Sequence, residues 1–569
     1  MPTLIAGSWL QLVMASAIGL AAAQNPAPVP PQASASSAKN TDSRPPGRSN
    51  SFDDVVDHAI LQERRLLGII RNFKPVVETY LQNMKPDREL GAVPKDDQYF
   101  LSRLDLSSEA PVDYSFLEQQ GWAHRLKKKI PTPSQTFLPL GFAQAIFPDR
   151  SHFDRENYTF EFVRWEVLGD VRCVVMDVTP RPTSGSSRFF GRMWVEDQDF
   201  NIVRFMGTYT SKSLAKYSFH FDSWRLNVMP RLWLPAFVYT EESDPNQSSS
   251  RGIRFKAQTR LWGYDLQHAG DHKEYTKPLT DRPLSVGANR TEPSQDLSPT
   301  LSEPRAQYYS AEENVVERLQ IAGLMAPAGE VDQILQIVVN NLLITNELDI
   351  VGVRCRVLLT APLESFVVGR TIVISRGLLD VLPDEGALAA VLAHELAHVV
   401  LRHSVGSEYA STSRLLFPDL KTFQELNFRF SEDQEAAADS KGLELLSKSP
   451  YKDKLANAGL FLQALKTRAP QLPSLIRPHL STGFASNGLV RMTNLINSAP
   501  QLEMSRTDQI AALPLGSRIK IDPWSNRIEL AKTKPVRALF AGEKMPFEVT
   551  AVYPYLKRLS SQEKAGVSK

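Results

Sequence analysis

The sequence predicts a multidomain α+β protein in which a mainly helical domain follows an antiparallel β-domain. Its 569 residues exceed what one hydrophobic core usually organises, so two or three domains are expected. Apolar residues recur every three or four positions over residues 51–88, alternate at every second position from about residue 157, and return to helical spacing beyond residue 309. Segments rich in Pro, Ser and Thr separate these regions and indicate flexible connections.

The first 50 residues predict export followed by a flexible segment. Residues 4–20 are largely apolar, and the alanines of residues 21–23 are small side chains of the kind that a signal peptidase recognises. We therefore expect a signal peptide over residues 1–23, a disordered linker over 24–50, and a periplasmic or secreted protein. No Lys or Arg precedes the apolar run, so a single N-terminal membrane anchor is the alternative.

Two regions follow before the next linker. The helical spacing predicts a helical N-terminal region over residues 51–150. Over residues 151–276, Tyr158, Phe160 and Phe162 begin an alternation with their neighbours that returns later in the segment. Alternation of this kind is typical of an antiparallel sheet with one dry and one wet face, arranged as a half-barrel or a sandwich.

The C-terminal half contains a linker, a helical domain and a further β-rich segment. Residues 277–308 form the predicted linker, and the mainly helical domain is expected over 309–500, with strands that include residues 366–375. Residues 501–569 are expected to be a β-rich extension, in which residues 518–530 have the pattern of a hairpin.

Composition excludes several classes of partner. Hydrophobic residues make up 42% and charged residues 22% of the chain, as in water-soluble globular proteins. With 65 Lys and Arg against 63 Asp and Glu, the net charge of +2 gives no reason to expect nucleic acid, and membrane contact is expected at most through the N-terminal segment. The two cysteines, Cys173 and Cys355, cannot form a disulfide framework, so two buried free thiols are expected.

The strongest functional signal is a His-Glu-x-x-His pattern inside an apolar helical run, residues 389–401. On a helix, His394 and His398 are one turn apart on the same face, where two imidazoles can bind one Zn²⁺. Glu395 is offset by about 100° and suits a base that acts on a water at the metal. The alternative is an ordinary core helix with two incidental histidines, but such a pattern arises by chance in only about one per cent of chains of this length.

A third ligand is needed, and the best candidate lies in a second acidic helix. Ser431 and Gln434 have the spacing of a capping box, which places the start of that helix. Glu435 and Asp439 then share a face one turn apart. We expect Glu435 to be the third metal ligand and Asp439 to orient a ligating imidazole from the second shell of the site.

These motifs resemble those of a known family. The segment Asp384–His403 reads Asp-Glu-Gly-Ala-Leu-Ala-Ala-Val-Leu-Ala-His-Glu-Leu-Ala-His-Val-Val-Leu-Arg-His and is similar to the motif helix of the zinc metallopeptidases of the CAAX prenyl protease/HtpX-like family, which are gluzincins. The segment Phe430–Asp439 resembles that family's second motif, and the likeness extends over roughly Ala311 to Asn497.

The resemblance implies a zincin-type peptidase domain with one Zn²⁺ per chain and polypeptide substrates. It implies that His394, His398 and Glu435 are the ligands, Glu395 is the general base and acid, and Asp439 is the orienting carboxylate. It also implies that an extended substrate adds to the edge of the strand before the motif helix. The residues of that edge are Phe366, Val367, Val368 and Gly369.

The chain departs from the family at two places. The family's usual Ser-Arg in the second motif is Ser431-Glu432 here, and its Ser-Thr-His-Pro element appears as residues 481–484 without the histidine. His479 and Arg491 are candidates for a transition-state donor, with surface or packing roles as the alternative. His403 is expected to lie near the last carbonyls of the motif helix.

The β-domain carries a second resemblance. Its segment Phe189-Phe-Gly-Arg-Met-Trp-Val-Glu-Asp, followed by Asn201-Ile-Val-Arg-Phe-Met-Gly207, looks like the half-open barrels of periplasmic LolA-type lipoprotein carriers. This likeness implies a concave apolar surface able to hold an acyl chain, a lipoprotein or a peptide. A sandwich with a filled core fits the strand pattern equally well.

The sequence thus predicts a zinc endopeptidase of the cell envelope or secreted space that acts on misfolded or exported proteins. One rival hypothesis is a lipoprotein carrier or chaperone-like binding protein whose peptidase scaffold is latent. Another is a metal-dependent hydrolase of non-peptide bonds.

Overall fold

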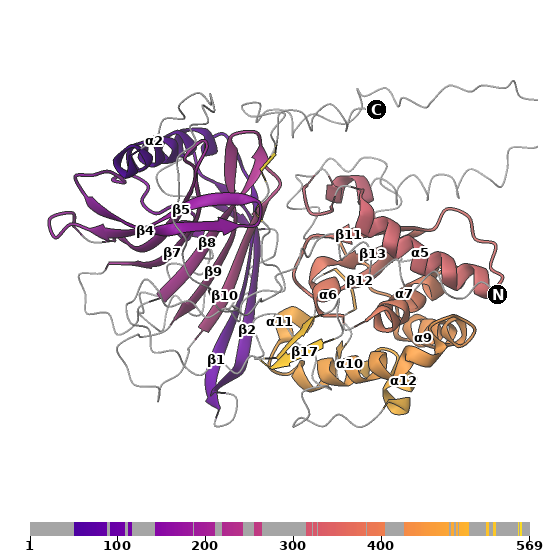
Figure 1. Cartoon of the computed structure of the whole chain (residues 1–569). Coiled ribbons are helices and arrows are strands. Elements are labelled where there is room, and N and C mark those ends of the chain that lie inside the picture. Colours follow the sequence, from indigo (N-terminus) through magenta and orange to yellow (C-terminus); the bar gives the residue numbers. More distant parts are fainter. Residues whose placement is uncertain are drawn as a thin grey trace, which may run out of the picture.

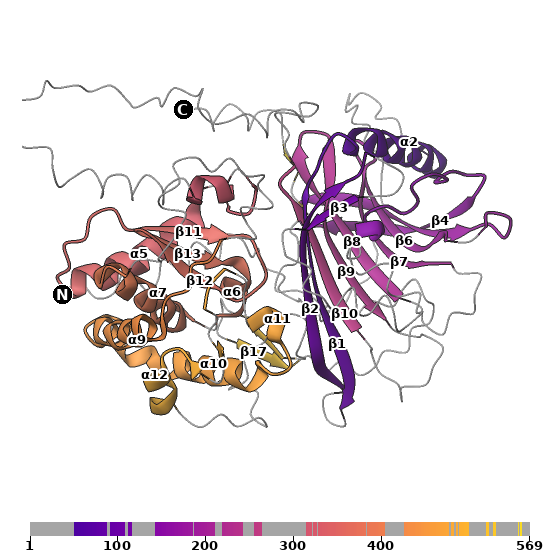
Figure 2. The same cartoon turned by 180° about the vertical axis from the view of Figure 1, so that it is seen from behind.

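The computed structural model places two domains, which we call the β-domain and the helical domain, side by side (Figures 1 and 2). The residues that the structure describes are 51–87, 91–107, 112–115, 143–185, 187–210, 219–242, 255–264, 315–320, 322–326, 328–382, 384–403, 426–476, 480–482, 485–486, 489–499, 519–522, 527–530, 556 and 558–559. The expected signal peptide (1–23) and the two expected linkers (24–50 and 277–308) lie outside these residues, as does His479.

The β-domain is built on one antiparallel sheet in the order β3-β2-β1-β10-β9-β8-β7-β6-β5-β4. The sheet twists strongly from β4 to β2 (Figure 1), so it has the form of a half-barrel and not of a sandwich. Its strands are β1 (Val76–Asp87), β2 (Gly91–Asp105), β3 (Val112–Ser115), β4 (Tyr158–Leu168), β5 (Val171–Pro180), β6 (Phe189–Glu196), β7 (Ile202–Tyr209), β8 (Phe219–Met229), β9 (Leu232–Glu242) and β10 (Phe255–Trp262).

Helix α2 (Phe52–Ile70) lies against one face of this sheet, which we call the inner face (Figure 1). Ser51 and Asp54 form a capping box at its start. Val56 of the helix packs into a buried cluster with Phe205 and Phe221 of the sheet. In the same layer Glu63 and Arg225 form a fully buried ion pair with N–O distances of 2.6 and 2.8 Å. The short 3-10 helix η2 (Ala143–Ile146) completes this layer.

The prediction of a helical region over residues 51–150 is wrong for residues 76–87 and 91–105. These residues form the strands β1 and β2 instead. The error has a physical cause. Strand β1 lies inside the sheet and is covered on both faces, with Val77 toward α2 and Tyr80 on the opposite face. A strand buried on both faces loses its alternation, and its apolar residues then imitate helical spacing over a short window.

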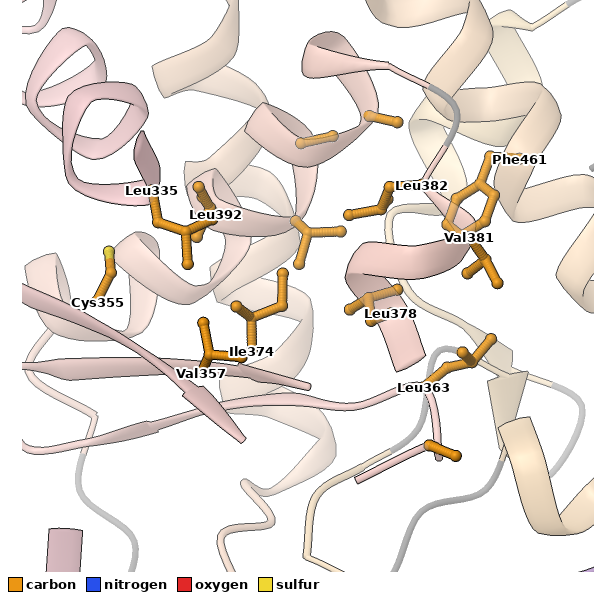
Figure 3. Close-up of a cluster of buried hydrophobic side chains, with 14 of the residues drawn as sticks. Leu335, Cys355, Val357, Leu363, Ile374, Leu378, Val381, Leu382, Leu392 and Phe461 are labelled. Atoms are coloured by element: carbon orange, nitrogen blue, oxygen red, sulfur yellow. The ribbon is translucent and has the colours of Figure 1, made fainter. Parts of the chain in front are cut away.

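The helical domain surrounds a three-stranded sheet in the order β11-β13-β12, in which β11 and β13 are parallel and β12 and β13 antiparallel. Figure 3 shows the core where Leu335, Val357, Ile374, Leu378 and Leu392 pack between this sheet and the helices. The elements are α5 (Glu330–Thr345), β11 (Arg354–Leu358), β12 (Ser365–Val368), β13 (Thr371–Ser375), α6 (Arg376–Val381), α7 (Glu385–Val400), α9 (Glu432–Ser447), η5 (Lys452–Lys454), α10 (Leu455–Arg468), α11 (Pro473–Ile476), β14 (Ala485–Ser486), β15 (Leu489–Val490) and α12 (Thr493–Ser498).

Residues 366–375, expected as one strand, are a hairpin of β12 and β13. The chain turns at Gly369, whose φ of 61° is a conformation that glycine adopts without a steric penalty. The hairpin predicted in the C-terminal extension is confirmed by the pairing of β16 (Ile519–Asp522) with β17 (Arg527–Leu530). Cys173 and Cys355 are both buried free thiols, as expected. Within the described ranges, no helix combines the length and apolar character needed to cross a bilayer.

The fold class predicted from the sequence, an α+β protein with a β-domain before a mainly helical domain, is confirmed. The outer face of the sheet, opposite α2, packs against the helical domain. Tyr80 and Val175 of this face belong to the same buried apolar cluster as Leu392 of α7. The two domains therefore share one continuous core.

Candidate metal centre

Helix α7 presents the histidines of the His-Glu-x-x-His pattern. The Asp384 side chain caps its N-terminus by accepting a hydrogen bond from the Ala387 amide at 2.8 Å. The helix is buried on nearly all sides, and His394 and His398 are exposed by only 2% and 1%. Their Nε2 atoms lie 3.2 Å apart. One helical turn therefore aims both imidazoles at the same point.

Helix α9 brings the carboxylate. The predicted capping box is present, since the Ser431 hydroxyl accepts from the Gln434 amide and the Gln434 side chain accepts from the Ser431 amide. Glu435, on the first turn, places Oε2 at 3.1 Å from His394 Nε2 and 3.7 Å from His398 Nε2. The structure thus brings together residues that are 41 positions apart in the chain.

The three side chains fit a metal ion. Their ligand atoms all lie within 4.8 Å of one another. Donors at about 2.0–2.1 Å from a tetrahedral Zn²⁺ are about 3.3 Å apart, which is close to the distances that separate these atoms. Two imidazole nitrogens and one carboxylate oxygen form a donor set of the kind that leaves a fourth position open for catalysis.

Helices α7 and α9 approach closely at Gly442. A Cβ at this position would lie 3.2 Å from the Ala393 carbonyl oxygen and from the backbone of His394. The small residues that the second motif offers, residues 436–438, contribute less to this approach, because only Ala438 among them is buried. Gly442 therefore permits the close approach of α7 to the helix that carries Glu435.

We expect Gly442→Leu to push α9 away from α7 and weaken metal binding at least about tenfold. Overpacking of a tight contact between backbones typically costs about 1–3 kcal/mol of stability, and the donor distances change with it. Zinc affinity from competition with a chromogenic chelator and the melting temperature would measure both effects. Ala437→Leu, on an exposed position of the same helix, is the control. Equal zinc affinity in the two variants would contradict this account of Gly442.

Asp439 stands behind His394, as expected for an orienting carboxylate. Its Oδ1 lies 2.8 Å from His394 Nδ1, and its Oδ2 accepts a hydrogen bond from the Met492 amide at 2.7 Å. A carboxylate at Nδ1 holds the proton on that nitrogen, so that Nε2 keeps its lone pair for a metal. Met492 is held in the left-handed region, with φ 58°, directly before α12.

The charges of the site affect its protonation. Burial disfavours an imidazolium at His394, but interactions with Asp439 and Glu435 outweigh burial and raise the pKa of His394 to about 9. Burial works against the ionised form of Glu435 as well, yet hydrogen bonds with His394 and His398 hold the pKa of this carboxyl well below its usual range. Near neutral pH we therefore expect His394 to be protonated before a metal binds.

We therefore expect zinc binding at pH 7–8 to release close to one proton. A ligating His394 must be neutral, whereas a pKa of about 9 keeps it protonated at this pH. Proton release declines and zinc affinity reaches its plateau as the pH rises through 9, where His394 is already neutral. Calorimetry in two buffers of different ionisation enthalpy gives the number of protons released. Asp439→Asn removes one cause of the raised pKa and should release fewer. Binding without proton release at pH 7.5 would refute the assignment.

Glu395 lies beside the ligands and is itself buried, with 1% exposure. Its Oε1 accepts hydrogen bonds from the Ser365 hydroxyl at 2.6 Å and from the Arg491 guanidinium at 3.1 Å. Arg491 also donates to Glu435 Oε1 at 3.4 Å. Arg491, a candidate donor from the sequence, is thus inside the site and bridges two of its carboxylates.

Two ring side chains lie next to His398, and the sequence assigned no role to the first of them, Phe430. Phe430 stacks on the His398 ring at a centroid distance of 3.9 Å, and His403 Nδ1 lies 3.0 Å from His398 Nδ1. The amide of His403 donates to the His398 carbonyl, so its backbone lies at the helix end, where it was expected. Burial and the nearby His398 lower the pKa of His403. Both residues restrict rotation of the His398 ring.

Strand β12 is an edge strand of its sheet, as the resemblance implies. Phe366, Val367 and Val368 lie in this strand with buried side chains, and the Phe366 ring stacks on Phe428 at 4.5 Å. Gly369 belongs to the turn that follows and not to the strand. Ser365, the first residue of β12, is the link between this strand and Glu395. Nothing in its local sequence marks it, because serine is common at the ends of strands.

Comparison with solved structures gave matches that cover about a third of this chain. One is a LolA superfamily protein from Nitrosomonas europaea, at 12% identity and a TM-score of 0.17, with 36% of this chain and 92% of that chain covered. Another is described as a "putative outer membrane lipoprotein-sorting protein domain" from Vibrio parahaemolyticus, at 12% identity and a TM-score of 0.20, with 37% and 92% covered. Comparison with curated proteins gave no match.

Residues 328–417 match the sequence model of Peptidase family M48. The matched segment includes α5, the three-stranded sheet and α7 with its two histidines, and it ends before α9. This family consists of zinc metallopeptidases. The match and the ligand geometry agree: residues 328–417 are similar to the zinc metallopeptidases of family M48.

Proposed function

We propose that this protein is a zinc-dependent endopeptidase that hydrolyses peptide bonds of misfolded or exported proteins in the cell envelope or secreted space. The observation that carries the proposal is the convergence of His394, His398 and Glu435 within 4.8 Å, with the buried Glu395 beside them. Zinc, when bound, supplies a Lewis acid for the scissile carbonyl and acidifies a coordinated water to a pKa of about 7.

The residues of the chain perform the remaining steps. Glu395 accepts the proton of the attacking water and then passes it to the leaving amine. Asp439 keeps the Nδ1 proton on His394, so that Nε2 remains a ligand. Arg491, which lies between Glu395 and Glu435, compensates the negative charge that gathers as the carbonyl is attacked.

The edge strand and the N-terminal segment support this substrate class. An extended chain can add to the side of β12 that no described strand occupies through backbone hydrogen bonds, and only unfolded or flexible polypeptides present such a segment. The apolar first 23 residues support export, with a single N-terminal anchor as the alternative.

The rival reading, a lipid or lipoprotein carrier with a latent peptidase scaffold, needs an open concave surface. In the described part of the β-domain, α2 and η2 fill the inner face, where Glu63 and Arg225 are buried among Phe205 and Leu234. This packing weighs against the carrier. Lipid that co-purifies with a zinc-free protein would favour it instead.

The test is the degradation of unfolded casein by the purified full-length protein. We expect cleavage that a chelator abolishes and stoichiometric zinc restores, and mass spectrometry of the early products should show cuts inside the casein chain. Release of single terminal residues would show that the protein is an exopeptidase and not an endopeptidase. Intact casein in the presence of fully zinc-loaded protein would remove the proposal.

A further inference from the structure

A buried ion pair of the β-domain lies at the boundary with the helical domain. Glu78 of β1 and Arg260 of β10 are cross-strand partners, and they are exposed by only 1% and 7%. Arg260 donates to Glu78 Oε2 through Nε at 2.8 Å and through a second guanidinium nitrogen. The Tyr99 hydroxyl adds a hydrogen bond to Glu78 Oε1 at 2.8 Å. The pair is thus held on the outer face of the sheet with several of its hydrogen-bonding positions satisfied.

Both members of the pair also bind the backbone of the helical domain. Glu78 Oε1 accepts a hydrogen bond from the Ala361 amide at 2.6 Å, and Arg260 donates to the Leu359 carbonyl at 3.1 Å. These two contacts flank Thr360 in the segment 359–364, which joins β11 to β12. Burial opposes the charge of Arg260, but Glu78 outweighs burial and raises the pKa of Arg260, so the guanidinium stays charged and its hydrogen bonds are charge-assisted.

The segment 359–364 has little freedom to move independently of its surroundings. The Thr360 carbonyl accepts a hydrogen bond from the Gly377 amide at 3.0 Å, and a Cβ on Gly377 would lie 1.8 Å from the Ala361 carbonyl oxygen. The Glu364 amide donates to the Ser375 hydroxyl at 3.2 Å. Backbone contacts this close transmit a displacement of residues 359–361 to the start of β12.

Strand β12 begins with Ser365, whose hydroxyl donates to Glu395 Oε1 at 2.6 Å. Arg491 donates to the same oxygen. Two donors on one carboxylate oxygen define the rotation of the carboxylate, and a general base must be oriented to within a fraction of an ångström to act efficiently. Ser365 is therefore placed to set the orientation of Glu395.

We infer that the β-domain takes part in assembling the catalytic site: Glu78 and Arg260 hold the segment 359–364, and through it Ser365 positions Glu395. This inference rests on the proposed function, because it assigns Glu395 the role of general base. Ser365, Glu78 and Arg260 are positioning residues, since each of them acts through another residue. The β-domain then supports catalysis from the outer face of its sheet, whatever its inner face binds.

The first experiment measures kcat and KM of full-length variants on a quenched-fluorescent peptide that the wild type cleaves. Ser365→Ala should lower kcat about tenfold, which corresponds to about 1.4 kcal/mol in the barrier, with KM and zinc content within about twofold of the wild type. Ser365→Thr keeps the hydroxyl and should recover most of the activity. Glu78→Gln should lower kcat about three- to tenfold in the same manner, since it weakens the hold on Ala361.

A double variant tests whether Glu78 affects catalysis through Ser365. If Glu78 acts through Ser365, Glu78→Gln combined with Ser365→Ala should lose clearly less than the product of the two single losses. A loss equal to that product would show that Glu78 acts by another route. Should Glu78→Gln not fold, Tyr99→Phe removes one donor to Glu78 Oε1 and takes its place.

The chain offers a matched control in Glu63. Glu63 belongs to α2 and forms a buried ion pair with Arg225 of the same sheet. This pair lies on the inner face of the sheet, away from the helical domain. Glu63→Gln should lower the melting temperature and leave kcat per folded molecule unchanged. Hydrogen exchange followed by mass spectrometry adds a readout independent of activity. Exchange over residues 359–368 should rise in Glu78→Gln, and exchange over α2 should rise in Glu63→Gln.

The outcomes separate this inference from the proposed function. If the wild type cleaves peptides while Ser365→Ala and Glu78→Gln keep full kcat, the proposed endopeptidase activity is correct and the proposed positioning role is wrong. If Glu63→Gln lowers kcat as much as Glu78→Gln, general destabilisation explains both losses, and the contact of Glu78 with the segment 359–364 has no specific role in catalysis. If the zinc-loaded wild type cleaves no peptide, both the proposed function and the positioning role are wrong.

Discussion

Glu395→Gln will lower kcat by about a thousandfold while zinc remains bound. A positioned general base contributes about 10²–10⁴ to the rate, and the amide of glutamine cannot accept the proton of the water. The replacement keeps the size of the side chain, and the amide oxygen can still accept from Ser365 and Arg491, which both donate to Glu395 Oε1. The fold and the ligand set should therefore persist.

The measurement is kcat on the peptide substrate together with zinc content by elemental analysis. Glu432→Gln, which changes an exposed carboxylate at the start of α9, is the control and should retain full activity. A Glu395→Gln protein that keeps more than about a tenth of the wild-type kcat would show that another group takes the proton, and the mechanism proposed here would be wrong.

Glu435→Ala will have the largest effect on metal content. It removes one of three donors, and the two remaining imidazoles cannot close a tetrahedral site on their own. Loss of an outer-shell partner alone typically costs 10- to 100-fold in metal affinity, so loss of a direct ligand should cost at least about a hundredfold. The variant also leaves His394 and Arg491 without the carboxylate that both contact.

Equilibrium dialysis against a zinc buffer, followed by activity at saturating zinc, separates lost affinity from lost chemistry. Asp433→Ala, an exposed carboxylate on the same first turn, makes the same change in charge and is the control. A Glu435→Ala protein that binds zinc as tightly as the wild type would show that the third ligand lies elsewhere in the chain.

Much of the metal centre could be predicted from the sequence because its elements are local. The positions of His394, Glu395 and His398 on one helical face follow from 3.6 residues per turn, and the start of α9 follows from a capping box four residues long. Both patterns depend on neighbouring residues only. The edge position of β12 was inferred by resemblance and agrees with the sheet order.

Other parts of the site depend on contacts between distant segments. Gly442 and Ser365 carry no local signal for their roles, and each matters because of the element that the fold packs against it. Arg491 was a candidate donor, yet only the structure shows that it joins Glu395 to Glu435. Strand β1 was missed for a related reason, since burial on both faces removes the alternation that identifies a strand.

The sequence by itself determined the helix that presents the two imidazoles, the proposed base beside them and the helix that carries the proposed third ligand. Only the tertiary structure decided that these helices meet, that Ser365 reaches the base, and that Glu78 and Arg260 of the β-domain hold the segment leading to it. The physical reason is the separation along the sequence of the residues that interact. Periodicity and capping are properties of a few consecutive residues, whereas these contacts join residues 30 to 283 positions apart and exist only once the two domains share a core.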